Sequence, residues 1–181
     1  MKKILFVPAA ALALFLASCG GGSESTEATA PATEAPAATT DAATPGSDIP
    51  GIADVPVTDH IELTGNDQMQ FDKNLFKVKA GQEVKLTLKN IGTLPAAAMS
   101  HNVVILLPGT DVQKFGEAAV TAKDSEHIPQ DMLADVAAHT KMLGPGESDT
   151  ITFKLDEPGV YDFICTFPGH FGTMRGKIVA E

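Results

Sequence analysis

Residues 165–174 read Cys-Thr-Phe-Pro-Gly-His-Phe-Gly-Thr-Met and carry three potential metal donors of different softness. These donors are the thiolate of Cys165, the imidazole of His170 and the thioether of Met174. Cys165 ends a predicted strand, Pro168-Gly169 turns the chain, and Met174 precedes the last predicted strand. One loop can therefore direct three donors to a single point.

A second isolated histidine, His101, lies far upstream at the start of another predicted strand. Two imidazoles and a thiolate in a trigonal arrangement, with a weak axial thioether, form a blue-copper electron-transfer site. Thiolate and thioether favour Cu(I), whereas imidazole accepts either oxidation state of copper. We therefore predict one copper ion held by His101, Cys165, His170 and Met174.

The sequence around these donors reads mostly as short strands. Apolar and polar residues alternate over 83–89 and 148–155, and an apolar run at 102–107 ends at Pro108-Gly109. Further strands are predicted at 75–78, 160–165 and 177–180. Residues 111–122 have helical spacing, with Thr110 or Asp111 as the N-cap, and a second helical stretch is expected near 130–136. This pattern predicts an all-β Greek-key sandwich that carries a helical flap.

The N-terminal residues 1–18 read as a bacterial signal peptide. Lys2 and Lys3 precede an apolar run, Ile4–Leu16, that is too short to span a bilayer permanently. The following Leu16-Ala-Ser-Cys19 resembles a lipobox, in which Cys19 becomes the lipidated first residue of the mature protein. The alternative is an ordinary secretory signal with an incidental cysteine, and either reading predicts export.

Residues 19–56 are predicted to be a lipid-anchored, disordered linker. Between residues 20 and 50 the chain is rich in Ala, Pro, Thr and acidic residues, and it has no base and no aromatic residue. Such a segment buries too little apolar surface to offset its ordering entropy. One globular domain is predicted from Val57 to Glu181.

The charge of the chain limits its partners. Removal of residues 1–18 leaves 11 basic and 23 acidic residues, a formal charge of −12. Nucleic acid is not expected as a partner, because binding phosphates requires a basic patch. Anionic lipid is not expected to attract the chain either, so the acyl chains must serve as the anchor. An acidic surface can steer a basic partner protein.

Only two cysteines are present, so acylation of Cys19 leaves Cys165 without a disulfide partner in the chain. A lone cysteine in an exported protein is reactive, pairs with another chain or binds metal. The alternatives for Cys165 are a buried small hydrophobe, a Cys–His nucleophile and structural zinc. No protease signature surrounds Cys165, and structural zinc usually draws on several cysteines.

Several segments resemble the azurins, a family of blue-copper proteins with the cupredoxin fold. The loop has four residues between Cys165 and His170 and three between His170 and Met174, as in azurin. Three other segments match in the expected order: Gly65-Asn-Asp-Gln-Met-Gln-Phe71, Met99-Ser-His-Asn102 and Ala138-His-Thr-Lys141. The likeness extends from about Ile61 to the C-terminus, and the signal, lipobox and linker resemble those of lipid-modified azurins. The resemblance implies an eight-stranded cupredoxin sandwich with copper near one end.

The resemblance also implies roles for single residues. It makes His101, Cys165 and His170 the strong ligands and Met174 the axial one, with a weak contact from the Ser100 carbonyl where azurins have glycine. Asn102 and Thr166 match positions whose hydrogen bonds join the two ligand loops. An apolar docking collar around His170 is implied, for which ordinary core packing is the alternative; its members are Met69, Leu94, Met99, Phe167 and Pro168.

Two departures from the azurins concern stability and pH response. The family disulfide is absent, and Asn90 stands where the family has a pH-sensitive histidine, so no pH switching of the redox potential is expected through that position. The remaining histidines, His60, His127 and His139, read as solvated residues.

The sequence thus predicts a non-enzymatic one-electron shuttle, reduced and oxidised by redox proteins such as cytochromes in transient contacts. It binds no small-molecule substrate. The lipid on Cys19 would hold it on a cell membrane, at the periplasmic or surface face, and on the outer membrane if the organism has one. The alternatives are a copper protein for delivery, storage or stress defence, and an adhesin that kept only the fold.

Overall fold

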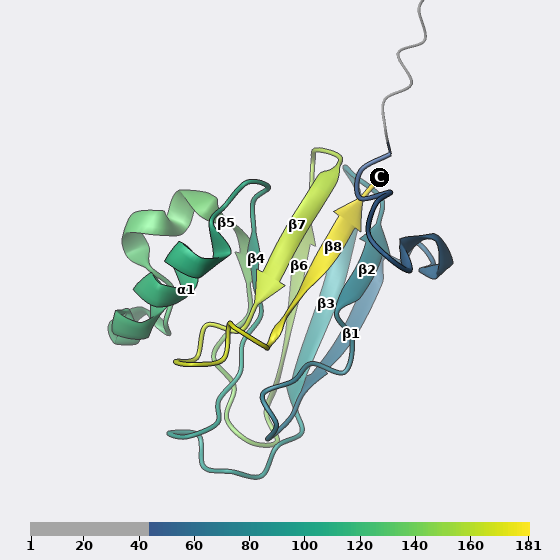
Figure 1. Cartoon of the computed structure of the whole chain (residues 1–181). Helices are drawn as coiled ribbons and strands as arrows, with labels where there is room; N and C mark the ends of the chain where they lie inside the picture. Colours follow the sequence, from purple (N-terminus) through teal and green to yellow (C-terminus); the bar gives the residue numbers. More distant parts are fainter. Residues whose placement is uncertain (1–43) are drawn as a thin grey trace, which may run out of the picture. The chain divides into compact units, whose positions relative to one another are not determined.

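Residues 44–181, the part of the chain that the structure describes, form two β-sheets packed face to face in this computed structural model (Figure 1). One sheet has the strand order β1-β3-β6 and the other β2-β8-β7-β4-β5. The strands are β1 (His60–Gly65), β2 (Leu75–Val78), β3 (Glu83–Asn90), β4 (Val104–Leu106), β5 (Val136–His139), β6 (Ser148–Lys154), β7 (Gly159–Ile164) and β8 (Arg175–Ala180). The predicted all-β sandwich is confirmed.

The main core lies between the sheets and follows from the alternation of apolar residues. In β3, Val84, Leu86 and Leu88 are buried, while Lys85 and Lys89 on the other face are exposed. β3 pairs with β6 in antiparallel fashion and with β1 in parallel fashion. On the opposite sheet Phe163 and Ile178 complete this core. β3 therefore buries one face, as a period-two pattern requires.

The antiparallel hairpin of β7 and β8 sets the position of the metal loop. The strands are paired from Gly159 with Ala180 to Ile164 with Arg175. Residues 165–174 connect them, so this loop lies at the Ile164–Arg175 end of the sandwich. It is the end toward the bottom in Figure 1, where the loop lies next to α1 (Val112–Thr121).

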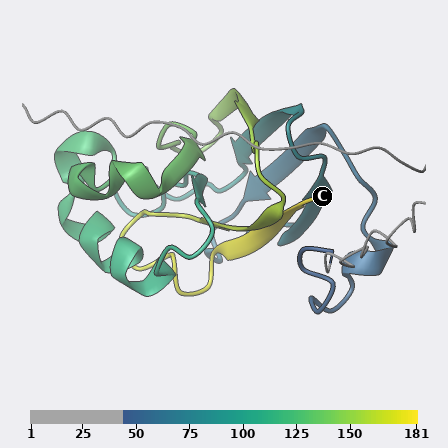
Figure 2. The same cartoon turned by 90° about the horizontal axis from the view of Figure 1, so that it is seen from above.

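The predicted flap is present and has a small core of its own. Asp111 caps α1 by accepting a hydrogen bond from the Lys114 N–H at 3.0 Å. The second predicted helical stretch is the 3₁₀ helix η3 (Gln130–Asp135), and a further 3₁₀ turn, η2 (Lys123–Ser125), lies between it and α1. Figure 2 shows these helices at one side of the sandwich. The flap core is separate from the main one and comprises Val104, Leu106, Phe115, Ile128 and Ile164.

The strands differ from the sequence prediction in two respects. β1 and β5 are strands that the sequence analysis did not assign, and β4 is shorter than the predicted 102–107. Asn102 and Val103 leave the strand because their groups bond elsewhere: the Val103 N–H donates to the Thr140 hydroxyl, and Asn102 bonds to Thr166. β5 is short and only partly buried, and a short strand of this kind needs few apolar residues, so its sequence gives a weak strand signal.

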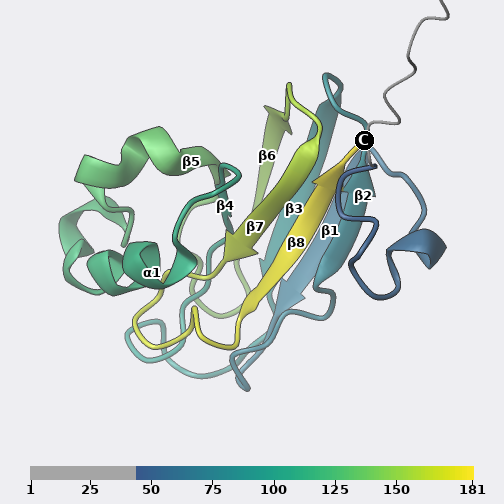
Figure 3. The same cartoon turned by 45° about the horizontal axis from the view of Figure 1, so that its top comes forward.

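Residues 44–56, which the sequence assigned to the disordered linker, are turns and a 3₁₀ helix, η1 (Ile52–Asp54) (Figure 3). Gly46 has φ of 69°, and a Cβ there would lie 3.0 Å from Val179 and 3.2 Å from Val160. Ile52 is buried. A few scattered apolar side chains are thus enough to pack a polar segment such as residues 44–56 against the face of a sheet. The signal peptide, Cys19 and the linker up to residue 43 lie outside the described residues.

No helix within residues 44–181 is both long and apolar enough to cross a membrane.

A substitution in β8 tests how tightly the hairpin packs. A Cβ on Gly176 would collide with the Asn74 carbonyl oxygen and the Phe163 ring. We expect Gly176→Ala to lower the free energy of unfolding by about 1–3 kcal/mol, the usual cost of overpacking a core. Urea unfolding measures this loss. Gly172→Ala is the control, because no atom lies within 4 Å of its Cβ; equal midpoints for the two variants would contradict the prediction.

Candidate metal centre

The loop after β7 closes on itself through its own backbone. The His170 N–H donates to the Phe167 carbonyl at 3.0 Å, and the Met174 N–H donates to the His170 carbonyl at 2.8 Å. The Cys165 N–H donates to the Met174 carbonyl at 2.9 Å, which joins the two ends of the loop. These bonds place Cys165, His170 and Met174 together, and all three are buried.

His101 reaches the same point from the segment before β4. Its N–H donates to the Leu143 carbonyl at 3.0 Å, and its carbonyl accepts from the Leu143 N–H at 2.8 Å. The Cys165 Sγ lies 3.9 Å from Nδ1 of His101 and 3.5 Å from Nδ1 of His170. Among residues 44–181 these three side chains form the one cluster of three or more potential His, Cys or carboxylate ligands, with donor atoms within 4.8 Å of one another.

Hydrogen bonding outside the cluster orients His101. Its Nε2 lies 3.1 Å from the Asn66 carbonyl oxygen, which can only accept, so Nε2 carries the proton. The Nδ1 lone pair then faces the cluster and is free to bind a metal. A Cβ on Gly65 would lie 2.8 Å from Cε of Met174 and 2.9 Å from Cδ2 of His101, so both side chains lie against this glycine.

Burial sets the protonation of the three donors. Burial raises the pKa of the Cys165 thiol to about 12, partly offset by hydrogen bonds from the N–H groups of Asn102 and Phe167. Burial, reinforced by His101, lowers the pKa of His170 to about 4, and burial also lowers the pKa of His101. Both imidazoles are therefore neutral near pH 7. Two neutral imidazoles, a thiol and a thioether, buried together, fit the preferences of copper.

The predicted link between the ligand loops is present in the structure. The Thr166 N–H donates to Oδ1 of Asn102 at 2.8 Å, and Nδ2 of Asn102 donates to the Thr166 hydroxyl at 2.8 Å. Both residues are buried. Asn102 follows His101 and Thr166 follows Cys165, so this pair of bonds fixes the distance between two predicted ligands.

Ser100 and Asn90 flank the centre. Ser100 is buried and its hydroxyl donates to the Ala96 carbonyl at 2.7 Å, while the approach of its own carbonyl to the metal stays a prediction. Asn90 is buried and fully bonded: Nδ2 donates to the carbonyls of Met99 and Leu143, and Oδ1 accepts from the Gly92 N–H. An amide at this position does not titrate.

The residues of the predicted collar are accessible to different degrees. Met69 and Leu94 are 37% and 43% exposed, which favours the docking reading over core packing for these two. Met99, Phe167 and Pro168 are partly buried. The Phe167 ring lies 4.8 Å from the His170 ring, centroid to centroid. The collar role of the five residues stays a prediction.

Three contacts around the loop were missed in the sequence. His127, read as solvated, is partly buried: its Nδ1 lies 2.8 Å from the Ala119 carbonyl, and its ring meets Phe167 edge-on with centroids 6.0 Å apart. Phe171 packs against Gly116 of α1. A glycine inside a helical pattern is the signal that could have indicated this close approach.

Asp67 holds the loop that carries Leu94. Its carboxylate accepts hydrogen bonds from the N–H groups of Thr93 and Leu94 and from the Thr93 hydroxyl. The pKa of Asp67 lies below its ordinary value of 3.8, chiefly because of the Thr93 N–H. A carboxylate whose pKa is lowered by folding stabilises the folded state when the pH is above the ordinary pKa. This stabilisation is lost as the pH falls through the lowered pKa of the folded protein.

We therefore expect the Thr93 and Leu94 amides to be protected from hydrogen exchange at neutral pH and to lose protection only in acid below pH 3.8. Asp67→Ala should remove that protection at every pH, as NMR exchange measurements can show. Asp72→Ala is the matched control, since Asp72 accepts from the Thr64 N–H instead. Unchanged protection in Asp67→Ala would refute this role.

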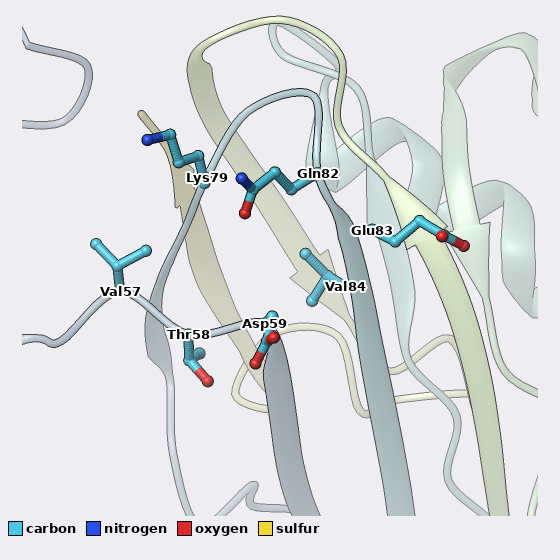
Figure 4. Close-up of a pocket in the computed structure, with 7 residues that line it drawn as sticks. All are labelled: Val57, Thr58, Asp59, Lys79, Gln82, Glu83 and Val84. Carbon is cyan, nitrogen blue, oxygen red and sulfur yellow. The ribbon is translucent and has the colours of Figure 1, made fainter.

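A groove of about 340 Å³ lies at the other end of the sandwich, between the start of β1 and the turn from β2 to β3 (Figure 4). Its lining is Val57, Thr58, Asp59, Lys79, Gln82, Glu83 and Val84. It includes neither His nor Cys and is separated from the cluster by the length of the strands, so it takes no part in the metal centre.

Comparisons with known proteins agree with this geometry. Residues 57–181 match the family described as copper binding proteins, plastocyanin/azurin family. Azurin of Pseudomonas aeruginosa is 36% identical over 125 residues, which cover 67% of this chain and 84% of that azurin. Outer membrane protein H.8 of Neisseria gonorrhoeae is 42% identical over 120 residues, 64% of either chain, so the match spans less than two thirds of the H.8 protein.

A solved structure shows the same likeness in three dimensions. The crystal structure of dithionite-reduced auracyanin from the photosynthetic bacterium Roseiflexus castenholzii superposes with a TM-score of 0.63 at 37% sequence identity. The superposition covers 70% of this chain and 99% of auracyanin.

Proposed function

The chain belongs to the plastocyanin/azurin family of copper-binding proteins, and from this premise we propose that it is a type 1 (blue) copper electron carrier. The observation that carries the proposal is the convergence of the Cys165 Sγ and the Nδ1 atoms of His101 and His170 in a buried cluster. These three residues would be the strong ligands of one copper ion, and Met174 the weak axial ligand.

Bound copper would supply a centre that gains and loses one electron as Cu(I) and Cu(II). The protein residues prepare the place for it. Asn66 fixes the tautomer of His101 through the bond to Nε2. Cys165 must release its proton when metal binds, because its pKa is about 12 in the metal-free protein. Burial of all four donors excludes water, which keeps rearrangement small when the charge changes.

Electrons would enter and leave through the His170 edge of the centre. The Phe167 ring lies against the His170 ring, and the exposed side chains of Met69 and Leu94 belong to the proposed collar. A small apolar patch suits weak, transient docking of another redox protein, such as a cytochrome. The acidic chain favours a partner with basic charge around its own docking site. No substrate is bound, as befits a family of electron-transfer proteins rather than enzymes.

The proposal includes a lipid anchor on Cys19 that holds the carrier on a bacterial cell membrane, at its periplasmic or surface face, and on the outer membrane where the cell has one. The H.8 relatives are named as outer membrane proteins, which supports a membrane location. Gly46 contacts Val160 and Val179, at the end of β7 and β8 opposite the metal loop. A tether that precedes residue 44 would therefore leave the metal end free for partners.

Copper titration followed by visible and electron-spin spectroscopy tests the function. We expect one Cu(II) per chain, an intense blue charge-transfer band and narrow copper hyperfine splitting. His60→Ala, which removes an exposed histidine outside the cluster, should give the same spectra. A colourless protein, or an ordinary tetragonal copper signal, would overturn the blue-copper proposal.

Redox cycling in the presence of a Cu(I) chelator separates the carrier from a copper-delivery protein. A carrier should keep its copper through repeated reduction and oxidation, because the same buried donors serve both oxidation states. Transfer of the copper to the chelator on reduction would favour delivery or storage instead.

A further inference from the structure

Two aromatic side chains of the metal loop rest on the helical flap. Phe167, three residues before His170, meets the ring of His127 edge-on, with centroids 6.0 Å apart. Phe171, the residue after His170, lies against α1 at Gly116. His170 therefore lies between two points at which the loop contacts the flap. Figures 1 and 3 both show the loop beside α1.

The contact at Gly116 is unusually close. A Cβ at this position would lie 2.5 Å from Cδ2 and 2.7 Å from Cδ1 of Phe171, well inside van der Waals contact. The ring thus lies directly on the helix backbone, where only glycine leaves room. Glycine is an unfavourable residue in the middle of a helix, since it loses the most backbone entropy on folding. Its presence inside Val112–Thr121 is explained by the ring that it admits.

The flap core reaches the metal loop at two points. Ile164, fully buried in this core, precedes Cys165, and Phe171, packed against it from outside, follows His170. Phe115 and Ile128 hold the flap side of the same cluster. The main core between the sheets is a separate cluster. The flap core can therefore transmit a change in packing to the loop without a change in the main core between the sheets.

We propose that Gly116 and Phe171 are positioning residues for His170: the flap, through this contact, sets where the imidazole lies before copper binds. The inference rests on the proposed function only in taking His170 as a ligand. Because the contact exists in the protein alone, it predicts a property of the copper-free state as well as of the copper site.

Variants at the two positions separate positioning from a simple helix effect. Gly116→Ala should stabilise the helix itself, because alanine has a higher helix propensity than glycine. If Gly116 had no role beyond the helix, amide exchange in the loop would therefore stay the same or become slower. If the contact positions His170, the added methyl displaces Phe171 instead. We then expect the His170 and Met174 amides to exchange about tenfold faster in the copper-free protein, as overpacking weakens local structure. The His170 ring nitrogen shifts should move as well.

The double variant Gly116→Ala/Phe171→Ala provides the decisive comparison. Phe171→Ala alone leaves a void beside the helix and should also speed exchange in the loop. The methyl group added by Gly116→Ala partly fills that void, so the double variant should exchange more slowly than the product of the two single effects. Val120→Ala, an exposed substitution on the same helix, is the control, and the Leu86 amide in β3 reports any global loss of structure. If Phe171→Ala fails to fold, Phe171→Leu replaces it.

The outcomes distinguish this inference from the proposed function. Two results would overturn the positioning role, whatever copper does. One is that amide exchange in the loop and the His170 shifts are the same in Gly116→Ala as in the control Val120→Ala. The other is that the effects of the two single variants simply multiply in the double variant. Copper-loaded Gly116→Ala should show a shifted charge-transfer band while still binding one copper. A colourless wild type would reject the blue-copper proposal but leave the copper-free NMR result interpretable.

Discussion

Copper-loaded protein with the substitution Cys165→Ser is expected to lack the intense blue band completely. The band requires transfer of charge from a thiolate to Cu(II), and in residues 44–181 Cys165 is the one cysteine. Serine is nearly isosteric and can accept the same hydrogen bonds from the Asn102 and Phe167 N–H groups. Its hydroxyl does not ionise near neutral pH, so the two imidazoles would hold copper weakly and in an ordinary geometry. Visible and electron-spin spectra of the titrated variant measure both changes.

Two controls make this result specific to the thiolate. Urea unfolding of copper-free Cys165→Ser should give a midpoint close to that of the wild type, because the exchange of sulfur for oxygen leaves the packing nearly intact. His139→Ala, an exposed histidine in β5, should keep the full band. A blue band that survives in Cys165→Ser would mean that another group provides the charge transfer, and the ligand assignment would have to be abandoned.

The cluster of potential metal donors could be predicted from the sequence because three of its members lie in one short loop. The spacing from Cys165 to Met174 fits the closed turn that the structure shows, with the Met174 N–H bonded to the His170 carbonyl. His101 was predictable through its flanking residues, although a lone histidine is a weak signal. Its approach to Cys165 depends on the pairing of β4 with β7, which is a long-range contact.

The elements missed in the sequence share a dependence on long-range packing. β5 carries little apolar signal, and its pairing with β4 makes it a strand. Residues 44–56 dock only because the outer face of β7 and β8 offers Val160 and Val179. The contact of Phe171 with Gly116 joins residues that are far apart in the chain: a glycine inside a helical pattern indicates a close approach, but not which residue approaches. Local patterns predict elements, whereas these contacts arise from how the elements are placed.

Removal of the amide that joins the ligand loops should have the largest effect on stability among the residues around the metal. Asn102→Ala leaves the Thr166 N–H and hydroxyl without their partner in a buried site. Since each buried group left unpaired costs about 1–3 kcal/mol, we expect the free energy of unfolding of the copper-free protein to fall by about 2–4 kcal/mol. Urea unfolding of the copper-free protein checks the figure.

Asn102→Ala should still give a blue copper band, although its stability falls, because the substitution keeps the backbone N–H that bonds to Cys165. The ligands remain, but the distance between the His101 and Cys165 segments is no longer fixed, so we expect a shifted and broadened band. Thr166→Val is the graded control: it removes the hydroxyl and keeps the bond from the Thr166 N–H to Asn102. Its loss of stability should therefore be smaller, and an equal loss in the two variants would show that the backbone bond adds nothing to the link between the ligand loops.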